Sequence, residues 1–329
     1  MRQQKKIKIG VVGAGHLGKY HINHLSKHAD IDFVGFFDTN QDGAKKIAKE
    51  FSVKSFEKID QLISASDGVH IVTPTNFHYE IAIQCLEKNK DIFIEKPITN
   101  TTKEADKIIQ IAASKKCIVQ VGHIERFNPT INKLKNIVSS PHYIEIERLA
   151  PFQARGTEVP VVLDLMVHDI DLILSMVNSK IIDIHASGAK MMSNTVDLAH
   201  AHIKFENGVV ANLKSSRIAQ NYVRKIRTYE KNLYTITDLM IPQIEVYGLE
   251  KTSTFSSRCI EQTIDTAVGS KKLFYEKVVP EKKDALLEEI NDFINCIKSR
   301  HAPTVDGKQG LQALEIALEI EKKIIHNDK

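Results

Sequence analysis

The stretch KIKIGVVGAGHLG, residues 6–18, decides the fold of this chain. Its first half reads as a short apolar strand, and its second half carries glycines at G-x-G-x-x-G spacing where a helix is expected to begin. Gly13 allows a tight turn, Gly15 lets backbone amides approach a pyrophosphate, and Gly18 permits close packing of a helix on a strand. The stretch therefore predicts a dinucleotide-binding loop.

An acidic residue follows at the distance that such a loop requires. Asp38 ends the second expected strand, 20 residues beyond Gly18. A carboxylate there would accept hydrogen bonds from the adenosine ribose and would repel a 2′-phosphate, which favours NAD over NADP. His16 and Leu17, inside the loop, are predicted cofactor contacts. In the alternative reading, the glycines form an ordinary loop and Asp38 is a turn residue.

The first part of the chain alternates short apolar runs with helical patterns. Because the strands are apolar throughout rather than alternating, they predict a parallel sheet covered on both faces. The expected strands are KIKIGVV, DFVGFF, GVHIVT, DIFIE and CIVQVG, with helices near residues 17–28, 41–51, 75–89 and 102–116.

The pattern changes after about residue 140. Successive strand signals joined by the hairpin turns ENG, 206–208, and EKN, 230–232, predict a mostly antiparallel sheet. The expected strand segments are HYIEIERLA, IDIHASGA, AHAHIKFENGVVANLKSS, KIRTYEKNLYTITD and PQIEVYG, and helices are expected at about 282–299 and 307–326.

Length and composition limit the class of protein. With 329 residues, two domains are expected, residues 1–124 and 125–329, with the last helices able to pack back on the first domain. The net charge of +4 is dispersed, so nucleic acid is not an expected partner.

No window has the roughly 18 apolar residues of a membrane span, so no membrane partner is expected. The four cysteines form no CxxC pair, which suits reduced thiols in a cytoplasmic protein.

Residues at strand ends form a second set of candidates. Thr73 and Pro74 end an expected strand at the carboxyl edge of the sheet, where open α/β sheets bind ligands. Together with Asn76 and His78 they are candidate cofactor contacts. Thr75 or Asn76 could instead cap the next helix.

Two further segments place ionisable groups in apolar surroundings. DIFIEKPIT, residues 91–99, delivers Glu95 and Lys96 to the same sheet edge, where both are candidate cofactor contacts; as structure alone, Lys96 would be a solvated charge. DLMVHDID lies in an apolar run, and on a helix Asp164, His168 and Asp171 would share one stripe while Asp169 points elsewhere. Such groups are costly in an apolar run unless something pairs with them or uses them.

Taken together, these segments resemble the Gfo/Idh/MocA oxidoreductases over essentially the whole chain. The resemblance implies a Rossmann domain followed by an α+β domain with a large open, mostly antiparallel sheet, with NAD or NADP and hydride transfer to or from a sugar or polyol. One departure is Met166, where many members have glycine. The segments that carry the resemblance are GxGxxGxxH ending at His21, EKP at Glu95–Pro97, GHIERFNP at Gly122–Pro129, the D-x-x-x-H-x-x-D stretch, and DGKQGLQALEIALEI.

Oxidation of a carbinol requires a base at the hydroxyl, and Lys96 and His168 are the candidates. We favour His168 as proton acceptor, with Lys96 holding the same oxygen and Asp164 orienting the ring or binding substrate. The resemblance supports this pair without ordering the two roles. Two other readings are charges paired at a domain interface and, from the i, i+4, i+7 spacing, a metal site; no metal is predicted.

Other polar residues have both a functional and a structural reading. His123 and Arg126 could line the substrate end of the site or act as caps. Arg155 could bind an anionic part of the substrate or be a solvated loop charge. A solvated or partly packed face is expected for His21, His24 and His28, and a structural role for His200 and His202.

The substrate is suggested by similarity alone. GHIERFNP and VVLDLMVHDIDLIL resemble members acting on nucleotide-activated amino sugars, the UDP-N-acetylglucosamine 3-dehydrogenase type. An inositol or free-sugar dehydrogenase fits the same motifs, and a non-catalytic NAD-binding sensor or assembly protein is the alternative from another class. A sheet with one face needing cover suggests a homodimer or homotetramer.

Overall fold

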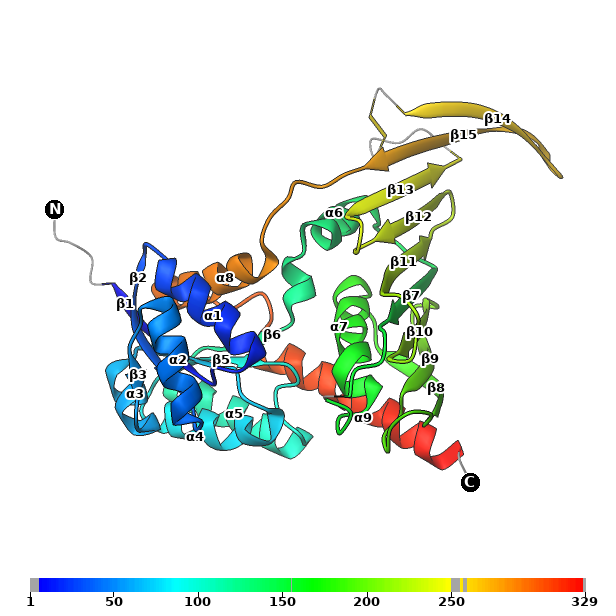
Figure 1. The fold of residues 1–329 in the computed structure, drawn as a ribbon. Coiled ribbons are helices and arrows are strands. Elements are labelled where there is room, and N and C mark those ends of the chain that lie inside the picture. The colour runs from blue at the N-terminus through cyan, green and yellow to red at the C-terminus, as the bar shows by residue number, and fades with distance from the viewer. Residues whose placement is uncertain (1–5, 155, 250–254, 257–258, 328–329) are drawn as a thin grey trace. The chain divides into compact units, whose positions relative to one another are not determined.

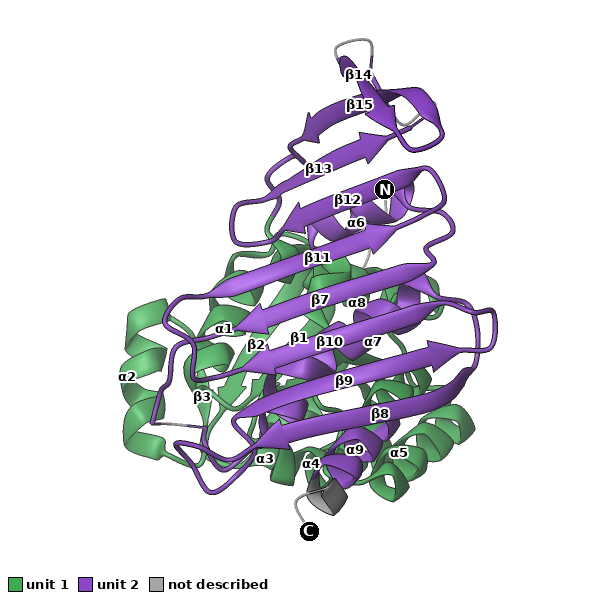
Figure 2. Cartoon of the chain, turned by 90° about the vertical axis from the view of Figure 1, so that its right-hand side faces the viewer, with its two compact units in different colours: residues 1–127, 284–314 green, residues 128–283, 315–329 purple. Residues whose placement is uncertain are grey.

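The computed structural model describes residues 6–154, 156–249, 255–256 and 259–327. The chain divides into two compact units (Figure 2). Unit 1 comprises residues 1–127 and 284–314, and unit 2 comprises residues 128–283 and 315–329. The chain thus returns to unit 1 for its last two helices, the second of which continues into unit 2.

Unit 1 is built on a six-stranded parallel sheet with the order β3-β2-β1-β4-β5-β6. This is the doubly wound order, in which the connections reverse direction between β1 and β4, so ligands are expected beyond the carboxyl ends of these strands. The strands are β1 Ile7–Val12, β2 Ile31–Phe37, β3 Ser55–Phe56, β4 Gly68–Ile71, β5 Asp91–Glu95 and β6 Val119–Gly122.

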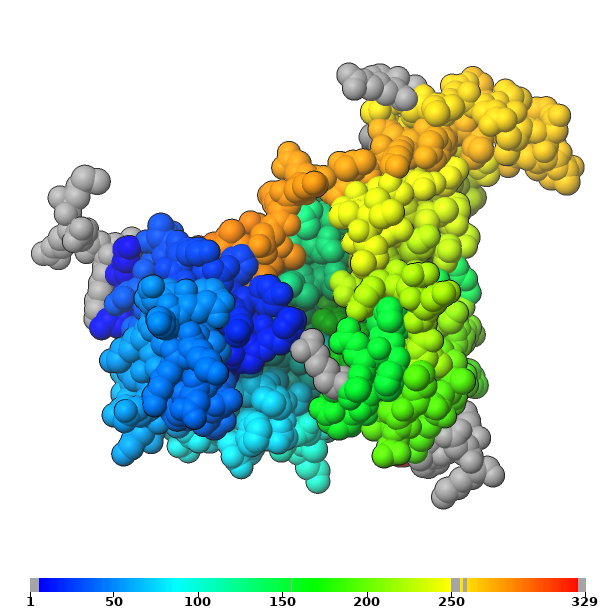
Figure 3. Space-filling view, in the orientation of Figure 1, coloured from blue at the N-terminus to red at the C-terminus, as the bar shows by residue number. Residues whose placement is uncertain are grey.

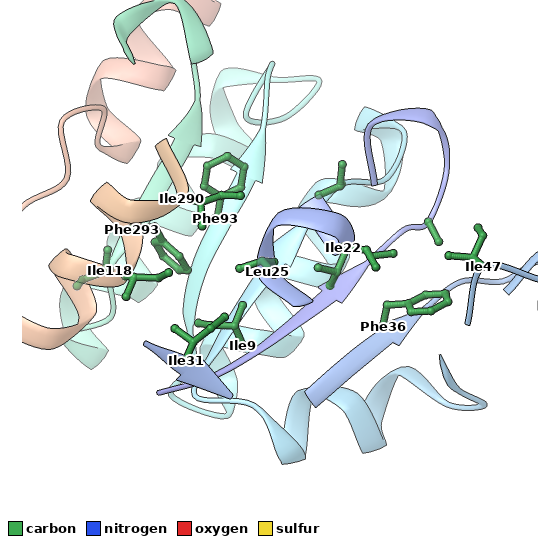
Figure 4. Packing of buried hydrophobic residues seen from close by; sticks show 14 of the residues in the cluster. Ile9, Ile22, Leu25, Ile31, Phe36, Ile47, Phe93, Ile118, Ile290 and Phe293 are labelled. Carbon is green, nitrogen blue, oxygen red and sulfur yellow. The ribbon is translucent and has the colours of Figure 1, made fainter. Parts of the chain in front are cut away.

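Helices cover both faces of this sheet (Figure 1). Side chains of α1, α2 and α8 form one core layer with β1, β2 and β5, and Figure 4 shows side chains of α1 and α8 lying over the strands. A Cβ on Gly10 would meet Leu62 of α3, which packs on the opposite face. The helices are α1 His16–Lys27, α2 Gln41–Phe51, α3 Ile59–Ala65, η1 Thr75–Phe77, α4 His78–Glu87, α5 Thr102–Lys115, η2 Ile124–Phe127, α8 Ala285–Ser299 and the beginning of α9 Gly307–Asn327.

Unit 2 contains a nine-stranded sheet with the order β14-β15-β13-β12-β11-β7-β10-β9-β8. All neighbours are antiparallel except β7 and β10. The predicted hairpin turns at 206–208 and 230–232 are confirmed. The strands are β7 Tyr143–Leu149, β8 Ile181–Ala189, β9 Leu198–Phe205, β10 Val210–Ser216, β11 Val223–Tyr229, β12 Leu233–Asp238, β13 Gln243–Gly248, β14 Ile260–Thr266 and β15 Gly269–Val278.

One face of this sheet is packed and the other is open (Figure 2). Along β7 the side chains alternate, and Ile144, Ile146 and Arg148 lie on the buried face. In the view of Figure 2 the strands stand in front of the unit's helices. These are α6 Pro129–Ile137, the π-helical turn η3 Val162–Met166, α7 Val167–Met176 and the end of α9.

Most of the predicted elements are present, and a few were missed. Helix α2 and strand β5 have the predicted bounds, whereas β3, α3, α6, β14 and β15 were not predicted. The β14–β15 hairpin is largely exposed and forms the yellow and orange end of unit 2 in Figure 3. In the part of the chain that the structure describes, no helix is long and apolar enough to cross a membrane.

Candidate active site

The glycine loop at the end of β1 has the turn at Gly13 and the open space at Gly15 that its sequence predicts, whereas Gly18 contacts the loop itself. Gly13 has a φ of +97°, and a Cβ there would lie 2.4 Å from the carbonyl oxygen of Val72. A Cβ on Gly18 would lie 2.2 Å from the carbonyl oxygen of Gly13, so its close contact is with the loop. A Cβ on Gly15 would meet nothing within 4 Å. Two glycines are therefore required by the protein's own backbone, and the third borders open space.

The amides beyond this loop are placed for an anion. Gly15 caps α1 and has no side chain to accept from the first-turn amides, which point toward the space beside it. His16 and Leu17 open the helix, and Leu17 is 49% exposed. The predicted cofactor residues in the loop thus lie together around an accessible helix N-terminus.

Asp38 lies beside this loop, as predicted. Its Oδ2 accepts a hydrogen bond from the Ala14 amide at 2.7 Å, and its Oδ1 accepts one from the Asn40 amide at 2.8 Å. A carboxylate has further lone pairs, so these bonds fix its direction and leave capacity for ribose hydroxyls. Asp38 therefore supports the loop and still offers acceptor lone pairs to a ligand.

The residues that follow β4 differ in their surroundings. His78 is buried between the carbonyl oxygens of Thr73 at 2.8 Å and Pro97 at 3.0 Å, so it joins the loops after β4 and β5. Burial lowers the pKa of His78. Pro74 and Asn76 are exposed. Among the described residues, Thr73 Oγ1 is a buried hydroxyl with no hydrogen-bond partner.

Lys96 follows β5 at the same carboxyl edge, half-buried and joined to Pro97 by a cis peptide bond. The carboxylate of Glu95, directly before it, contacts the buried ring of His21, with Nε2 3.0 Å from Oε1. His21 Nδ1 in turn lies 3.1 Å from Nδ1 of His70. Three ionisable side chains in mutual contact, His70, His21 and Glu95, therefore end at the residue before Lys96.

This arrangement corrects the expectation of a solvated or partly packed face for His21. The ring of His21 is 1% exposed because the first turns of α1 lie over β4 and β5. The other two histidines of that face behave differently: His24 lies 3.4 Å from Asp284, and His28 bonds to Asn291 at 2.8 Å. The sequence marked His21 only through its place in the GxGxxGxxH motif.

The predicted single stripe of Asp164, His168 and Asp171 is interrupted in unit 2. Asp164 lies in the π-helical turn η3, and α7 begins only at Val167. A π turn is wound more widely than an α-helix, so the i, i+4 spacing of a regular helix does not apply between Asp164 and His168, whereas His168 and Asp171 share the regular helix α7. Such turns recur at functional sites. Asp164 and His168 are half-buried, whereas Asp171 is 2% exposed.

Asp169 points away from this group, as predicted, and has a structural partner. Its carboxylate is fully buried and pairs with Arg148 of β7, whose Nη2 lies 2.8 Å from Oδ1. The carboxylates in this apolar run thus have different surroundings. Asp169 ties α7 to the sheet, and Asp164 lines a cavity.

This cavity, of about 200 Å³, lies at the end of β7 beside η3. Its lining carries three arginines and one aspartate, together with the half-exposed ring of Tyr222. In the pairing of β7 with β11, Arg224 lies directly opposite Arg148. Arg217 is held by the carbonyl oxygens of Gly156 and Val159. The charged residues of the lining are Arg148, Asp164, Arg217 and Arg224.

These arginines were missed by the sequence analysis, although a signal was present. In YIEIERL the apolar positions recur every second residue, so Arg148 lies on the same face of the strand as Ile144 and Ile146. A charge in the buried phase of a strand needs a partner or a use. Arg224 shares a strand face with Ile226 by the same alternation.

The remaining predicted substrate residues lie in unit 1 or outside the described residues. His123 is 1% exposed and follows β6. Arg126, in η2, donates to the carbonyl oxygen of Thr304 at 3.3 Å. Arg155 lies outside the described residues. Substrate binding by Arg155, His123 and Arg126 stays a prediction.

The residues of unit 1 fit a nicotinamide dinucleotide. The open space at Gly15, the first-turn amides of α1, the Asp38 carboxylate and the partnerless Thr73 hydroxyl supply the donors and acceptors that a dinucleotide needs. Within the described ranges, no group of three His, Cys, Asp or Glu side chains is arranged to hold a metal ion.

Comparison with known families gives matches in both parts of the chain. Residues 7–123 match the family described as "Oxidoreductase family, NAD-binding Rossmann fold". Residues 149–250 match the family described as the GFO/IDH/MocA C-terminal domain.

Individual relatives cover nearly the whole chain. A UDP-N-acetylglucosamine 3-dehydrogenase from Acidithiobacillus ferrooxidans is 34% identical over 95% of this chain and 96% of the relative. A solved structure of that enzyme covers 98% of both chains with a TM-score of 0.87 and 32% identity. A myo-inositol 2-dehydrogenase from Thermotoga maritima is 25% identical over 97% of this chain and 96% of the relative.

Proposed function

The chain belongs to the GFO/IDH/MocA family of oxidoreductases, and on that premise we propose that it oxidises a hydroxyl group of a nucleotide-activated sugar with NAD. The proposed reaction is oxidation at C3 of UDP-N-acetylglucosamine or a close analogue. The 34% identity to a dehydrogenase of that name supports this choice over the more distant inositol dehydrogenases.

The observation that carries the substrate class is the cavity beside Asp164. Its lining carries three arginines, whose guanidinium N–H groups suit anionic oxygens, although Arg148 also pairs with Asp169 and Arg217 lies 3.6 Å from Asp197. Arg148 and Arg217 are held by Asp169 and by backbone carbonyls, so their guanidinium groups are already ordered. A neutral polyol has no charge for these arginines to bind, whereas the diphosphate of a nucleotide sugar could form ion pairs with them.

The proposed roles of the reacting residues follow from the chemistry of carbinol oxidation. Bound NAD, held by the glycine loop and Asp38, would supply the acceptor for the hydride of the carbinol carbon. His168 accepts the hydroxyl proton, and Lys96 donates a hydrogen bond to the same oxygen as negative charge develops on it. Asp164, next to the arginine cavity, binds the sugar or orients His168.

The preference for NAD over NADP rests on Asp38. Its carboxylate is fixed by the amides of Ala14 and Asn40 beside the glycine loop. A 2′-phosphate on the adenosine ribose would meet this negative charge, while free ribose hydroxyls could donate to it.

The direct test is a substrate panel in which NADH formation is measured with UDP-sugars, free sugars and inositols. Activity with UDP-N-acetylglucosamine is expected, and activity confined to the unphosphorylated polyols would refute the nucleotide-sugar assignment. The variants Lys96→Ala and His168→Ala should keep NAD affinity and lose at least about 100-fold in kcat. Normal turnover in either variant would refute its catalytic role.

Two alternatives are separated by the same panel. An inositol dehydrogenase, the activity named for several relatives of about 25% identity, would turn over inositols and ignore UDP-sugars. A non-catalytic NAD-binding protein would bind NAD, measured by calorimetry, and turn over no compound of the panel.

The open face of the unit 2 sheet supports a further proposal, a homodimer or homotetramer. Five tyrosines form a row across five neighbouring strands, with consecutive ring centroids 4.7 to 5.7 Å apart. A second copy could cover such a surface by two-fold pairing.

Tyr234→Arg should then shift the sedimentation of the protein toward the monomer, while Met240→Arg, in the turn after β12, should not. The tyrosines are Tyr143, Tyr229, Tyr234, Tyr247 and Tyr275.

A further inference from the structure

Tyr222, directly before β11, adds an aromatic ring to the arginine-lined cavity of unit 2. Tyr222 is 47% exposed and lines the same cavity as Asp164. Arg224, two residues further along the chain, lines it as well and lies opposite Arg148 in the sheet. A solvent-accessible ring and the guanidinium groups of two neighbouring strands therefore border one space.

The segments that form this wall are joined to one another by backbone hydrogen bonds. The Ala219 amide donates to the carbonyl oxygen of Ala150 at 3.1 Å, and the Ala150 amide donates to the carbonyl oxygen of Ser216 at 2.8 Å. These bonds connect the segment after β7 to the segment between β10 and β11. Both segments contribute side chains to the lining, so the cavity has fixed walls.

The ring of Tyr222 is tied across these two segments. Nε2 of Gln153 donates a hydrogen bond to the phenolic oxygen at 3.1 Å, and Gln153 also lines the cavity. The bond uses the hydroxyl group at the edge of the ring and takes up neither ring face. A ring that is already held in this way loses little conformational freedom when a flat group stacks on it.

The size of the cavity determines how much of a nucleotide sugar it can enclose. At about 200 Å³ it is smaller than the roughly 300–1,000 Å³ of sites that enclose a drug-sized ligand. A nucleotide sugar with its diphosphate among the arginines must therefore extend beyond the cavity. The proposed function assigns Asp164 to the sugar, which leaves the exposed ring of Tyr222 for the nucleoside.

We propose that Tyr222 is a specificity-determining residue that stacks on the nucleobase of the substrate, with Gln153 holding its ring. The proposal rests on the proposed function for the diphosphate and the sugar, and it adds recognition of the base. A nucleobase has a flat π face that suits an aromatic ring, whereas the arginines supply ion pairs to phosphates. The ligand class is thus a nucleoside diphosphate, bound more tightly than a diphosphate alone.

The first test uses fluorescence. The chain contains no tryptophan, so Tyr222→Trp introduces a single fluorophore at the proposed stacking position. The indole keeps a stacking surface, and a nucleobase stacked on it should quench its fluorescence. UDP should therefore quench the emission, and saturating inorganic pyrophosphate should not. Ile241→Trp, at a 64% exposed position in the turn between β12 and β13, is the control and should respond to neither ligand.

Calorimetric titration of the NAD-bound full chain measures the contribution of the ring to affinity. Tyr222→Ala should weaken UDP binding about 10-fold or more, as expected for loss of base stacking on an aromatic side chain. The affinity for inorganic pyrophosphate should stay within about two-fold of wild type, because the arginine contacts remain. Tyr222→Phe keeps the ring and loses only the hydrogen bond from Gln153, so its UDP affinity should stay within about three-fold.

Several results would overturn the stacking role. Unchanged UDP affinity in Tyr222→Ala, or no quenching by UDP in Tyr222→Trp, would each do so. An equal loss of UDP and pyrophosphate affinity in Tyr222→Ala would mean that the ring only shapes the cavity. A loss of affinity for N-acetylglucosamine 1-phosphate as large as that for UDP would assign the ring to the sugar. If Tyr222→Ala does not fold, quenching in Tyr222→Trp decides.

Failure of the proposed function gives a different pattern. If wild type binds UDP but oxidises no UDP-sugar of the panel, the proposed reaction is refuted, and the quenching result still decides the role of Tyr222. If wild type binds inorganic pyrophosphate and UDP equally, no base is recognised and the stacking role alone is refuted. If wild type does not bind UDP, the nucleotide-sugar assignment and the stacking role are both refuted.

Discussion

Arg148 and Asp169 form a buried ion pair with three close contacts. Nε of Arg148 lies 2.9 Å from Oδ1 and 3.1 Å from Oδ2 of Asp169, and Nη2 lies 2.8 Å from Oδ1. The pair joins β7 to α7 and so fixes the helix that carries His168. It also orders an arginine that lines the cavity beside Asp164.

Removing one partner of this pair should be costly. In Asp169→Asn the guanidinium stays buried without its counter-charge, and we expect the free energy of unfolding to fall by about 3 kcal/mol or more. The measurement is urea unfolding followed by circular dichroism. Glu261→Gln breaks the exposed pair with Lys272, 2.6 Å apart, and should cost less than about 0.5 kcal/mol. Equal losses in the two variants would contradict this account.

Asp38 should decide between the two nicotinamide cofactors. Asp38→Asn keeps the shape and one acceptor oxygen but removes the charge, so the ratio of kcat/KM with NADP to that with NAD should rise about 10-fold or more. Steady-state kinetics with both cofactors measures the ratio. The control is Asp42→Asn, an exposed change in the first turn of α2. A ratio that does not change in Asp38→Asn argues against a contact with the adenosine ribose.

Two glycines of the loop should respond to alanine in opposite ways. In Gly18→Ala the new Cβ would collide with the Gly13 carbonyl, so the protein should lose thermal stability with or without NAD. In Gly15→Ala the new methyl meets no protein atom, so the melting temperature of the NAD-free protein should change little. The affinity for NAD should nevertheless fall at least about 10-fold, because the methyl occupies space needed by the pyrophosphate. Calorimetric NAD titration separates the two effects.

The sequence predicted the parts whose signals are local. The glycine spacing, the apolar strands and the hairpin turn at Gly208 each depend on a few neighbouring residues, and each was found as predicted. The short strand β3 was missed because two residues, Ser55 and Phe56, give no periodic signal. Strands β14 and β15 are largely exposed and polar, so they lack the alternation of a half-buried strand.

Contacts between distant segments were beyond the reach of the sequence. The pairing of His21 with Glu95 joins residues 74 positions apart, and no periodicity relates them. The π turn at Asp164 also left no signal, because its residues fit the helical pattern on either side. Arg148 shows the limit clearly. The alternation of β7 predicts that its side chain lies on the buried face of the strand, but the sequence does not predict that its partner is Asp169.

Asp197 should make the free energy of unfolding depend on pH in the acidic range. Its Oδ2 accepts hydrogen bonds from the amides of Met191, Met192 and Ser193, and its Oδ1 accepts one from the Ser193 hydroxyl. Burial would raise the pKa of Asp197, but these hydrogen bonds lower it to about 2 from the usual 3.8. The folded-state pKa is thus the lower one, so the stabilisation is present above about pH 4 and disappears as pH falls toward 2.

The matching variant isolates this contribution. Urea unfolding at pH 5, 4, 3 and 2.5 should show that wild type exceeds Asp197→Asn by about 2 kcal/mol at pH 5 and that the difference shrinks as the pH falls. A difference that is constant over this range would mean that the variant acts through lost packing or through Arg217, whose Nε lies 3.6 Å from Oδ1, and not through the charge of Asp197.

Arg224 should discriminate between charged and neutral substrates. It lines the cavity beside Asp164 and lies opposite Arg148 in the sheet. In Arg224→Gln the KM for UDP-N-acetylglucosamine and the inhibition constant of UDP should both rise about 10-fold or more, while kcat changes little, because the lost contact serves binding. Lys133→Gln, on the exposed face of α6, removes the same charge from unit 2 and should alter neither constant. Unchanged constants for UDP would place its phosphates elsewhere and would leave the three arginines with a structural role alone.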